Sequence, residues 1–406
     1  MTLHLLITFG LMLFAATDFV LPADKNFHRL MYQLAFAFVF VFSTIKYYYG
    51  ADIHWYVRMY DVVAPPMDIV TGKFQWPAFE IGYTYFCSIC KYIGLSYWGH
   101  TAVVSVIYFY AIHRLFRLMP RFKVLALFLL FTFDANLILV QNRQCMAVSF
   151  LILAYLAYCE SKKIRTLLYA LLALSMHKSA ILFALPVGLF WMFGFQVKKE
   201  NYMMVFALML LLLILPMNKL LFALANAVGM SENMLVSLNH HLAMADAIQP
   251  IFILYAFMIL FLCVCDNQKN YFSQMKTILL VSSLALALLY PYYASLLRYR
   301  SYFMPFFIVY ILSTCSMLLE QEDNVKSILN KVSQRVLMQA SCGVFVLFAF
   351  FSTYVTYNWL NSLKSNPYTI STVFDLLKRD EKEIREERME LAKKNWELDF
   401  VVESVN

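Results

Sequence analysis

Arg143 is a permanently charged residue between two long apolar runs. In the stretch LILVQNRQCMAVSFLILAY, residues 137–155, its neighbours Gln141, Asn142 and Gln144 are hydrogen-bonding residues. One explanation is snorkelling, in which the stem covers apolar surface while the guanidinium reaches the membrane interface. The alternative is that the guanidinium holds a carboxylate or a pyrophosphate through two hydrogen bonds. Because ionisable groups beside membrane spans are costly, we favour function, with Gln144 as a neighbouring substrate-binding candidate.

His177 lies in a second apolar stretch, LSMHKSAILFALP, where Lys178 and Ser179 follow it. A lone histidine between helices is often only a hydrogen-bonded packing residue. A neutral imidazole can also take a proton from a hydroxyl nucleophile, and an imidazolium can support a phosphate. Backbone donors at a helix break would face an anion in the same way. We therefore predict a catalytic role for His177 and substrate binding for Lys178.

Arg298, Arg300 and Tyr302 repeat this combination in YYASLLRYRSYFMP. Cations and tyrosines at this point could simply mark the headgroup level of a membrane. Arg298 and Tyr302 are four residues apart, so they share a face if the stretch is helical, whereas Arg300 points elsewhere. We therefore predict Arg298 as catalytic and the other two as substrate-binding residues.

Two carboxylates complete the candidate site. Glu80 begins an amphipathic segment in WPAFEIGYTYF, and Asp52 lies in YYYGADIHWYVRMYD. Each could instead be a helix-terminal or capping residue. The aromatic residues around them, such as Tyr83, could stack on sugars or form an interfacial belt. We predict Glu80 as catalytic, and Asp52 and Tyr83 as substrate-binding.

The composition indicates a polytopic membrane protein. Of its 406 residues, 62% are apolar and 14% are charged, and the mean hydropathy is +0.65. Apolar runs of about 17 to 25 residues recur along most of the chain, and each could cross a bilayer as a helix. The first run lacks a basic leader and a small-residue cleavage site, so we expect it to be a retained span.

The sequence contains no motif for nucleotide or metal chemistry. It lacks a glycine-rich phosphate loop, a GxSxG elbow and an HExxH pair. The CxxC pair Cys87 and Cys90 has no second pair or nearby histidine, so small core residues are the better explanation. We expect no metal and no cofactor. The net charge of +8 is mainly a topology signal, and we expect no nucleic-acid partner.

The distribution of basic residues predicts the sidedness of the chain. If every basic cluster is cytoplasmic, the apolar spans must be paired or re-entrant. The clusters are 28–30, 113–123, 161–165, 197–200, 267–276 and 324–335. The predicted spans are 30–49, 97–113, 123–140, 145–160, 201–217, 250–265, 277–293, 302–319 and 336–358.

Two segments do not fit this pattern of full spans. The amphipathic segment 81–94 cannot then be a full crossing. About 30 apolar residues between 165 and 197 are too few for two spans, so we predict two half-length helices that meet near Met176–Ser179. Asp52, Glu80, Arg143, His177 and Arg298 would then share one cavity on the outer face.

The predicted organisation is a membrane domain at 1–372 and a charged helical tail at 373–406. The tail contains strong helix formers, and the apolar residues Leu377, Ile384, Leu391 and Leu398 recur at intervals of seven residues. One apolar residue per heptad is a thin seam, so a solvated or membrane-surface helix is favoured over a coiled coil.

The ordered motifs resemble the EpsG-like branch of the Wzy-type polysaccharide polymerases of bacteria. They are GADIHWYVRMYD, FEIGYTYF, NRQCMAVSFLILAYLAY, ALLALSMHKSAILFALP, RYRSYF and NPYTISTVFD, and they cover about residues 30 to 375. Arg143 matches the arginine of an Arg-Gln-x-x-Ala element, His177 a His-x-Ser-Ala element and Glu80 a Glu-x-Gly-Tyr element. Arg298 and Tyr302 match a late Arg-x-x-x-Tyr element. The tail lies outside this pattern.

The resemblance implies a GT-C-like bundle of about 10 to 12 membrane helices with broken helices and an external cavity. It implies an enzyme of the bacterial cytoplasmic membrane that polymerises repeat units carried on undecaprenyl pyrophosphate, at the outer face. Donor and acceptor would be lipid-linked oligosaccharides in the membrane lipid, and a chain-length regulator is a candidate partner. The alternatives are an O-antigen ligase and a flippase or transporter of the same lipid-linked unit.

Overall fold

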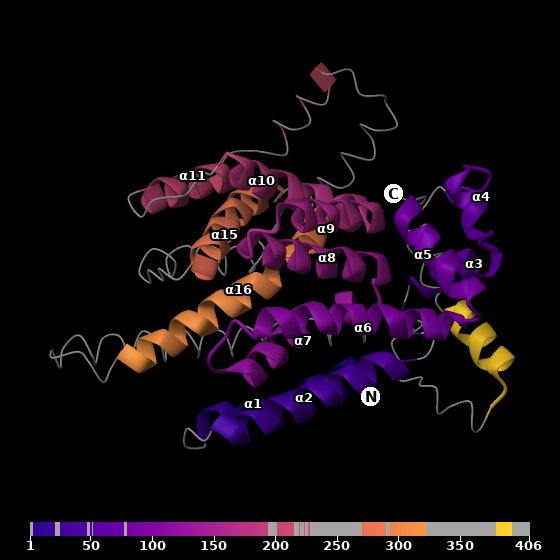
Figure 1. The fold of residues 1–406 in the computed structure, drawn as a ribbon, viewed down its shortest axis with the longest axis horizontal. Helices are drawn as coiled ribbons and strands as arrows, with labels where there is room; N and C mark the ends of the chain where they lie inside the picture. Colours follow the sequence, from indigo (N-terminus) through magenta and orange to yellow (C-terminus); the bar gives the residue numbers. More distant parts are fainter. Residues whose placement is uncertain are drawn as a thin grey trace. The chain divides into compact units, whose positions relative to one another are not determined.

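The computed structural model describes a chain whose regular elements are all helices, which confirms the predicted all-α class for this part (Figure 1). The described residues are 3–20, 25–46, 49–50, 52–76, 79–193, 201–214, 270–289, 293–321 and 379–391, with isolated positions between 219 and 227. The chain forms two compact units. The first contains residues 1–156, 166–178 and 311–406, and the second contains 157–165 and 179–310.

Four long apolar helices form the core of the first unit. They are α1 (Leu3–Val20), α2 (Lys25–Ile45), α6 (Tyr97–Phe116) and α7 (Lys123–Leu139). Helix α1 packs against α2 and α7, and α2 also packs against α6 and α7. Helices α1 and α2 approach closely at Gly10, where an added Cβ would lie 2.5 Å from the ring of Phe38. The absent side chain at Gly10 therefore permits this packing.

A buried carboxylate ties the start of α7 to α1. Phe122 precedes α7 in the left-handed region, with φ of 60°. Oδ2 of Asp18, near the end of α1, accepts a hydrogen bond from the Leu125 backbone N–H at 2.9 Å. This contact satisfies one of the backbone donors that a helix leaves unpaired at its N-terminus, and it places a negative charge where the helix dipole favours one.

Three short helices lie between α2 and α6. They are α3 (Ile53–Val62), α4 (Pro66–Val70) and α5 (Ile81–Tyr92), and α5 contacts α3, α4 and α6. The 12 residues of α5 extend about 18 Å, less than the hydrocarbon thickness of about 30 Å. This length agrees with the expectation that the amphipathic segment is not a full crossing, which stays a prediction.

The predicted helix break near His177 is confirmed. Helix α8 (Asn142–Cys159) is followed by α9 (Lys163–Met176), which ends directly before His177. A 3₁₀ turn, η1 (Lys178–Ala180), leads into α10 (Ile181–Met192). The last α-helical bond of α9 runs from the His177 N–H to the Ala173 carbonyl at 3.1 Å. The two halves are 14 and 12 residues long, as expected for half-length helices.

In the second unit, α10 and α11 (Tyr202–Ile214) both pack against α15 (Asn270–Leu289). Helix α16 (Tyr293–Gln321) is the last long helix described and belongs to the second unit as far as Tyr310. These helices lie at the predicted spans 201–217, 277–293 and 302–319. The predicted spans 250–265 and 336–358 lie outside the described residues.

Among the described helices, only Asn26–Ile45 has both the length and the apolar character expected of a membrane span. Two shorter apolar helices cover Leu6–Asp18 and Lys178–Met192. The predicted number of membrane helices, their sidedness and the shared external cavity stay predictions.

A short helix from the charged tail, residues 381–391, packs against α3 (Figure 1). Ile384 is 2% exposed and lies in one cluster with Ile53 and Val57, and Arg385 forms an ion pair with Asp61. Ile384 is one of the apolar residues at the seven-residue interval. The tail residues from 392 onward lie outside the described part, and the domain boundary at 372 stays a prediction.

Candidate functional site

Glu80 occupies the position directly before α5, but its carboxylate does not cap that helix. Its backbone is extended, with φ of −71° and ψ of 148°, and its side chain makes no capping hydrogen bond. The Glu80 carbonyl instead accepts bonds from the Thr84 N–H and the Thr84 hydroxyl, each at 3.0 Å. The carboxylate is therefore available for contacts outside α5.

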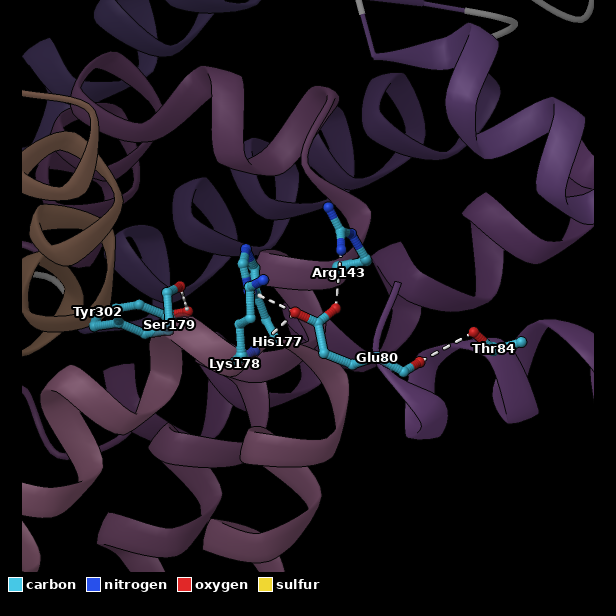
Figure 2. A network of polar contacts seen from close by, with 7 residues as sticks. All are labelled: Glu80, Thr84, Arg143, His177, Lys178, Ser179 and Tyr302. Carbon is cyan, nitrogen blue, oxygen red and sulfur yellow. Dashed lines mark hydrogen bonds and ion pairs between the residues drawn. The ribbon is translucent and has the colours of Figure 1, made fainter. Parts of the chain in front are cut away.

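Three donors from two distant segments surround this carboxylate, as Figure 2 shows. Nη1 of Arg143 donates to Oε2 at 2.9 Å, and the Lys178 backbone N–H donates to Oε1 at 2.9 Å. Nδ1 of His177 lies 3.3 Å from Oε1. The exposed fractions of the Glu80, Arg143 and His177 side chains are 11%, 20% and 9%. The predicted catalytic residues of the first unit thus form one half-buried cluster.

The helix break gives the cluster its backbone donor. Lys178 begins η1, so its N–H can point at Glu80 rather than at a carbonyl one turn earlier in an uninterrupted helix. The Lys178 side chain itself is exposed. The sequence prediction assigned substrate binding to this side chain, whereas the contact observed here comes from its main chain.

A close helix approach sets the distance between Glu80 and His177. A Cβ added at Gly82 in α5 would lie 2.4 Å from the Ser175 hydroxyl oxygen and 2.7 Å from the Ser175 carbonyl oxygen of α9. Gly82 is two residues after Glu80, and Ser175 is two residues before His177. The missing side chain at Gly82 therefore brings the two ionisable residues together.

Aromatic rings support the Arg143 guanidinium. Its central carbon lies 4.2 Å from the ring centroid of Phe79 and 5.9 Å from that of Tyr56. Tyr83, the predicted sugar-binding residue, is fully buried and packs edge-to-face on both rings, at 5.9 Å from Tyr56 and 5.7 Å from Phe79. Cation–π contacts of this kind hold a guanidinium in one orientation. Tyr83 thus lies beneath the rings that orient Arg143.

The donors keep Glu80 ionised. Burial alone would raise the pKa of Glu80, but the hydrogen bonds from His177 and the Lys178 N–H, with the charges of Arg143 and His177, lower it from 4.5 to about 2. A carboxylate is stabilised in its charged form when hydrogen bonds and positive charges converge on it. At neutral pH the cluster contains a carboxylate that stays negative.

The late Arg-x-x-x-Tyr element, Arg298 to Tyr302, lies in α16 within the second unit. Ser179 Oγ and Tyr302 Oη are 2.8 Å apart (Figure 2), and Tyr302 is fully buried in α16. Arg300 is half-buried in the same helix. Arg298 also belongs to α16, but its side chain lies outside the described part, and its predicted role is untested.

The two remaining candidates from the sequence are Asp52, at the start of α3, and Gln144, at the start of α8. Asp52 is the N-cap residue of α3 and makes no side-chain capping bond, although its carbonyl accepts from the Trp55 and Tyr56 backbone N–H groups. Gln144 is buried in the first turn of α8, 2% exposed. Their predicted contacts with substrate stay predictions.

Sequence reasoning missed one contributor to the site, Phe79, and expected the other, the Lys178 N–H, only as an unnamed backbone donor. Phe79 precedes Glu80 in the motif, but nothing in its type or spacing marks it as the platform for an arginine 64 positions later. The Lys178 N–H is a main-chain group and has no sequence signature of its own. The expected helix break predicted backbone donors facing an anion, and the structure gives Lys178 as the donor and the Glu80 carboxylate as the acceptor.

Comparison with known protein families identifies the chain. A model of the EpsG family matches residues 29–370, which include Glu80, Arg143, His177 and Tyr302. The chain belongs to the EpsG family. No curated protein and no solved structure gives a significant match. Membership of the EpsG family, together with the apolar helices, indicates a membrane protein with a role in polysaccharide biosynthesis.

Proposed function

We propose that this EpsG-family protein polymerises oligosaccharide repeat units carried on undecaprenyl pyrophosphate, at the outer face of the bacterial cytoplasmic membrane. The growing glycan moves from its pyrophosphate carrier to a hydroxyl of the incoming unit. The observation that carries this proposal is the Glu80 carboxylate held by Arg143, His177 and the Lys178 N–H, inside the region matched by the family. The glycan is already activated by its bond to the pyrophosphate, which departs as the leaving group. The reaction therefore needs no nucleotide.

The cluster has the charge to attract an anionic donor. Arg143 and the exposed side chain of Lys178 contribute two positive charges against the single carboxylate of Glu80, so the net charge is positive whether His177 is neutral or protonated. Arg143 is always protonated and can hold two phosphate oxygens in a plane. We propose that it binds the pyrophosphate and stabilises the charge that grows there as the glycosidic bond breaks. Arg298 is proposed as the second pyrophosphate-binding arginine.

His177 is the proposed general base. With its proton on Nδ1, the imidazole donates to Glu80 Oε1, and its lone pair is then on Nε2. A carboxylate behind a histidine fixes the tautomer and stabilises the imidazolium that forms when the ring accepts a proton. Nε2 would take the proton of the acceptor hydroxyl as that oxygen attacks the anomeric carbon. Glu80 would orient the ring.

Replacing Arg143 by Ala, and separately by Lys, tests the proposal. We expect both variants to lose polymer while lipid-linked single repeat units accumulate, because a lysine cannot reproduce the planar two-bond contact. Gel analysis of surface glycan and of extracted lipid-linked intermediates measures both species. Arg165→Ala, at an exposed arginine outside the cluster, is the matched control and should keep the ladder. Normal polymer length in both Arg143 variants would refute the proposal.

Two alternatives use the same lipid-linked unit. An O-antigen ligase would transfer the glycan to a lipid A core, and a flippase would only move the unit across the membrane. Purified protein with lipid-linked repeat units separates the three: a ladder indicates the polymerase, transfer to added lipid A core the ligase, and translocation without new bonds the flippase. The His177–Glu80 pair favours transfer chemistry, since translocation needs no general base.

A further inference from the structure

Helix α5 exposes large apolar and aromatic residues and buries its small polar ones. The exposed residues of this completely described helix are Ile81, Tyr85, Ile89 and Tyr92, with exposed fractions of 65%, 38%, 38% and 54%. Their spacing of four, four and three residues places them on one side of a helix. The usual order of a water-soluble protein, with apolar side chains inside and polar ones outside, is therefore reversed in α5.

The polar groups of α5 make their contacts within the protein. The hydroxyl of Ser88, which is fully buried, donates to the Ala64 carbonyl at 2.6 Å. Lys91 is the single charged residue of the helix, and its ammonium donates to the carbonyls of Asp61 and Val63 at 2.6 and 3.3 Å. The charge of α5 is therefore used in contacts with the protein, and the exposed stripe has none.

The segment before α5 has both kinds of surface. Helix α4, which packs against α5, exposes Met67 and Val70 at 67% and 62%. The turn that follows α4 instead exposes Thr71, Lys73 and Gln75, as expected for a segment in water. Both short helices thus expose apolar side chains, and the turn between them exposes polar ones.

The chemistry of the exposed stripe fits a lipid bilayer. A helix in hydrocarbon presents apolar side chains to lipid and directs its polar groups to the protein. Tyrosine is enriched where a protein meets the headgroups. Helix α6, which contacts α5, also contacts α2, whose residues Asn26–Ile45 have the character of a membrane span. Like α5, α6 exposes large apolar and aromatic residues, Val106 and Tyr110.

We propose that the exposed stripe of α5 lies among the acyl chains of one leaflet of the membrane. At about 18 Å, the helix is too short to cross both leaflets. Because Ile81 directly follows Glu80, the stripe begins beside the Glu80 cluster. Ionised groups are costly in hydrocarbon, so the contact holds the cluster at the boundary between acyl chains and headgroups. The inference concerns the depth of the site and does not depend on the reaction proposed for it.

Nitroxide spin labels on the full-length protein in phosphatidylcholine vesicles test this placement. Tyr85 and Tyr92 are replaced, one at a time, by p-acetylphenylalanine, an aromatic ketone that takes the label without removal of native cysteines. Power-saturation EPR then compares collisions with oxygen, which concentrates in hydrocarbon, and with a nickel chelate, which stays in water. We expect the ratio of oxygen to nickel collisions to match that at Val41, an exposed residue of α2, and to exceed that at Lys73 several-fold.

Each other outcome overturns the inference. Nickel accessibility as high as at Lys73 would place the stripe in water. Low accessibility to both reagents would mean that protein covers the stripe, either a second copy of the chain or another partner. Thermal unfolding checks that each labelled protein is folded, and a label at Ile89 replaces either tyrosine position if that variant does not fold. The measurement needs no substrate, so a failure of the polymerase proposal would leave its result standing.

Discussion

At the scale of residues, Glu80 is held too firmly in its ionised form to be an effective base. A general base works best when its pKa lies near the working pH, and the pKa of Glu80 is about 2. Both carboxylate oxygens also accept from donors of the protein. The sequence alone did not decide whether Glu80 or His177 is the general base. These contacts favour His177 as the base, with Glu80 holding it in position.

The lowered pKa of Glu80 predicts an acid-dependent loss of stability. Because the folded-state pKa of about 2 is below the ordinary 4.5, the contribution is fully present above about pH 4.5 and is lost as the pH falls toward 2. Its full size is about 3 kcal/mol. We expect Glu80→Gln to be less stable than the wild type at pH 7, with the difference at least halved at pH 3.

Thermal unfolding of the wild type and Glu80→Gln in the same detergent at both pH values measures this difference. Other carboxylates titrate in both proteins, so their effects largely cancel in the comparison. A difference that is unchanged, or larger, at pH 3 would contradict the assigned ion pair.

At the scale of elements, the approach of α5 to α9 controls the site from outside it. Gly82→Ala would place a methyl group against the Ser175 hydroxyl and carbonyl oxygens, and the backbone carbonyl cannot rotate away as a side chain can. Such overpacking costs about 1–3 kcal/mol, and relief requires the helices to separate. We expect Gly82→Ala to lengthen the Glu80–His177 contact and to reduce polymer formation strongly.

Glycan gels and thermal unfolding of Gly82→Ala measure both effects. Gly188→Ala is the matched control, because a Cβ at Gly188 in α10 meets no atom within 4 Å. Alanine also has the higher helix propensity, so the control should be as stable as the wild type or slightly more so. Full activity in Gly82→Ala would show that the close approach is not needed for the site.

The tail helix 381–391 is held on α3 mainly by apolar packing, in which Ile384 is the buried residue and Met389 also takes part. Ile384 is 2% exposed in its cluster with Ile53 and Val57, whereas the Arg385–Asp61 ion pair is solvent-exposed. Exposed ion pairs contribute about 0–1 kcal/mol, and truncation of a buried isoleucine to alanine costs about 2–5 kcal/mol. We therefore expect Ile384→Ala to release the helix and Arg385→Ala to loosen it only slightly.

Hydrogen exchange of peptides covering 381–391 and α3 measures this release. Faster exchange in Ile384→Ala and near-normal exchange in Arg385→Ala is the expected pattern. Lys382→Ala is a suitable control, since Lys382 lies on the exposed side of the helix. The opposite order would assign the docking to charge rather than to packing.

At the scale of the whole molecule, the cluster restricts the topology. Glu80, Arg143 and His177 touch, so they must lie on the same side of the membrane, as the positive-inside pattern predicts for the outer face. The 18 residues of α8 extend about 27 Å, enough to bring residues 160–162 near the opposite surface.

Cysteine labelling tests this sidedness. In a background without native cysteines, we expect Thr71→Cys to react with a membrane-impermeant maleimide in intact spheroplasts. Lys162→Cys should react only after the membrane is permeabilised. Both positions are exposed in the structure, so a lack of labelling would reflect the membrane and not burial. Labelling of both from the outside would contradict the predicted topology.

The sequence predicted those parts of the site that depend on local pattern. Arg143 and His177 are visible as polar residues in apolar runs, and the length of the run around His177 predicted the break between α9 and α10. The pairing of Glu80 with residues 63 and 98 positions later depends on tertiary packing, which a single sequence does not encode locally.

The long separation between the partners of Glu80 has a consequence for biosynthesis. Glu80 leaves the ribosome 98 residues before Lys178, which at about 5–20 residues per second is an interval of roughly 5 to 20 s. Throughout this interval the carboxylate has neither the His177 ring nor the Lys178 N–H as a partner. A nascent chain that stalls before residue 177 would therefore display an incomplete site, which quality-control proteases of the membrane could distinguish from the finished protein.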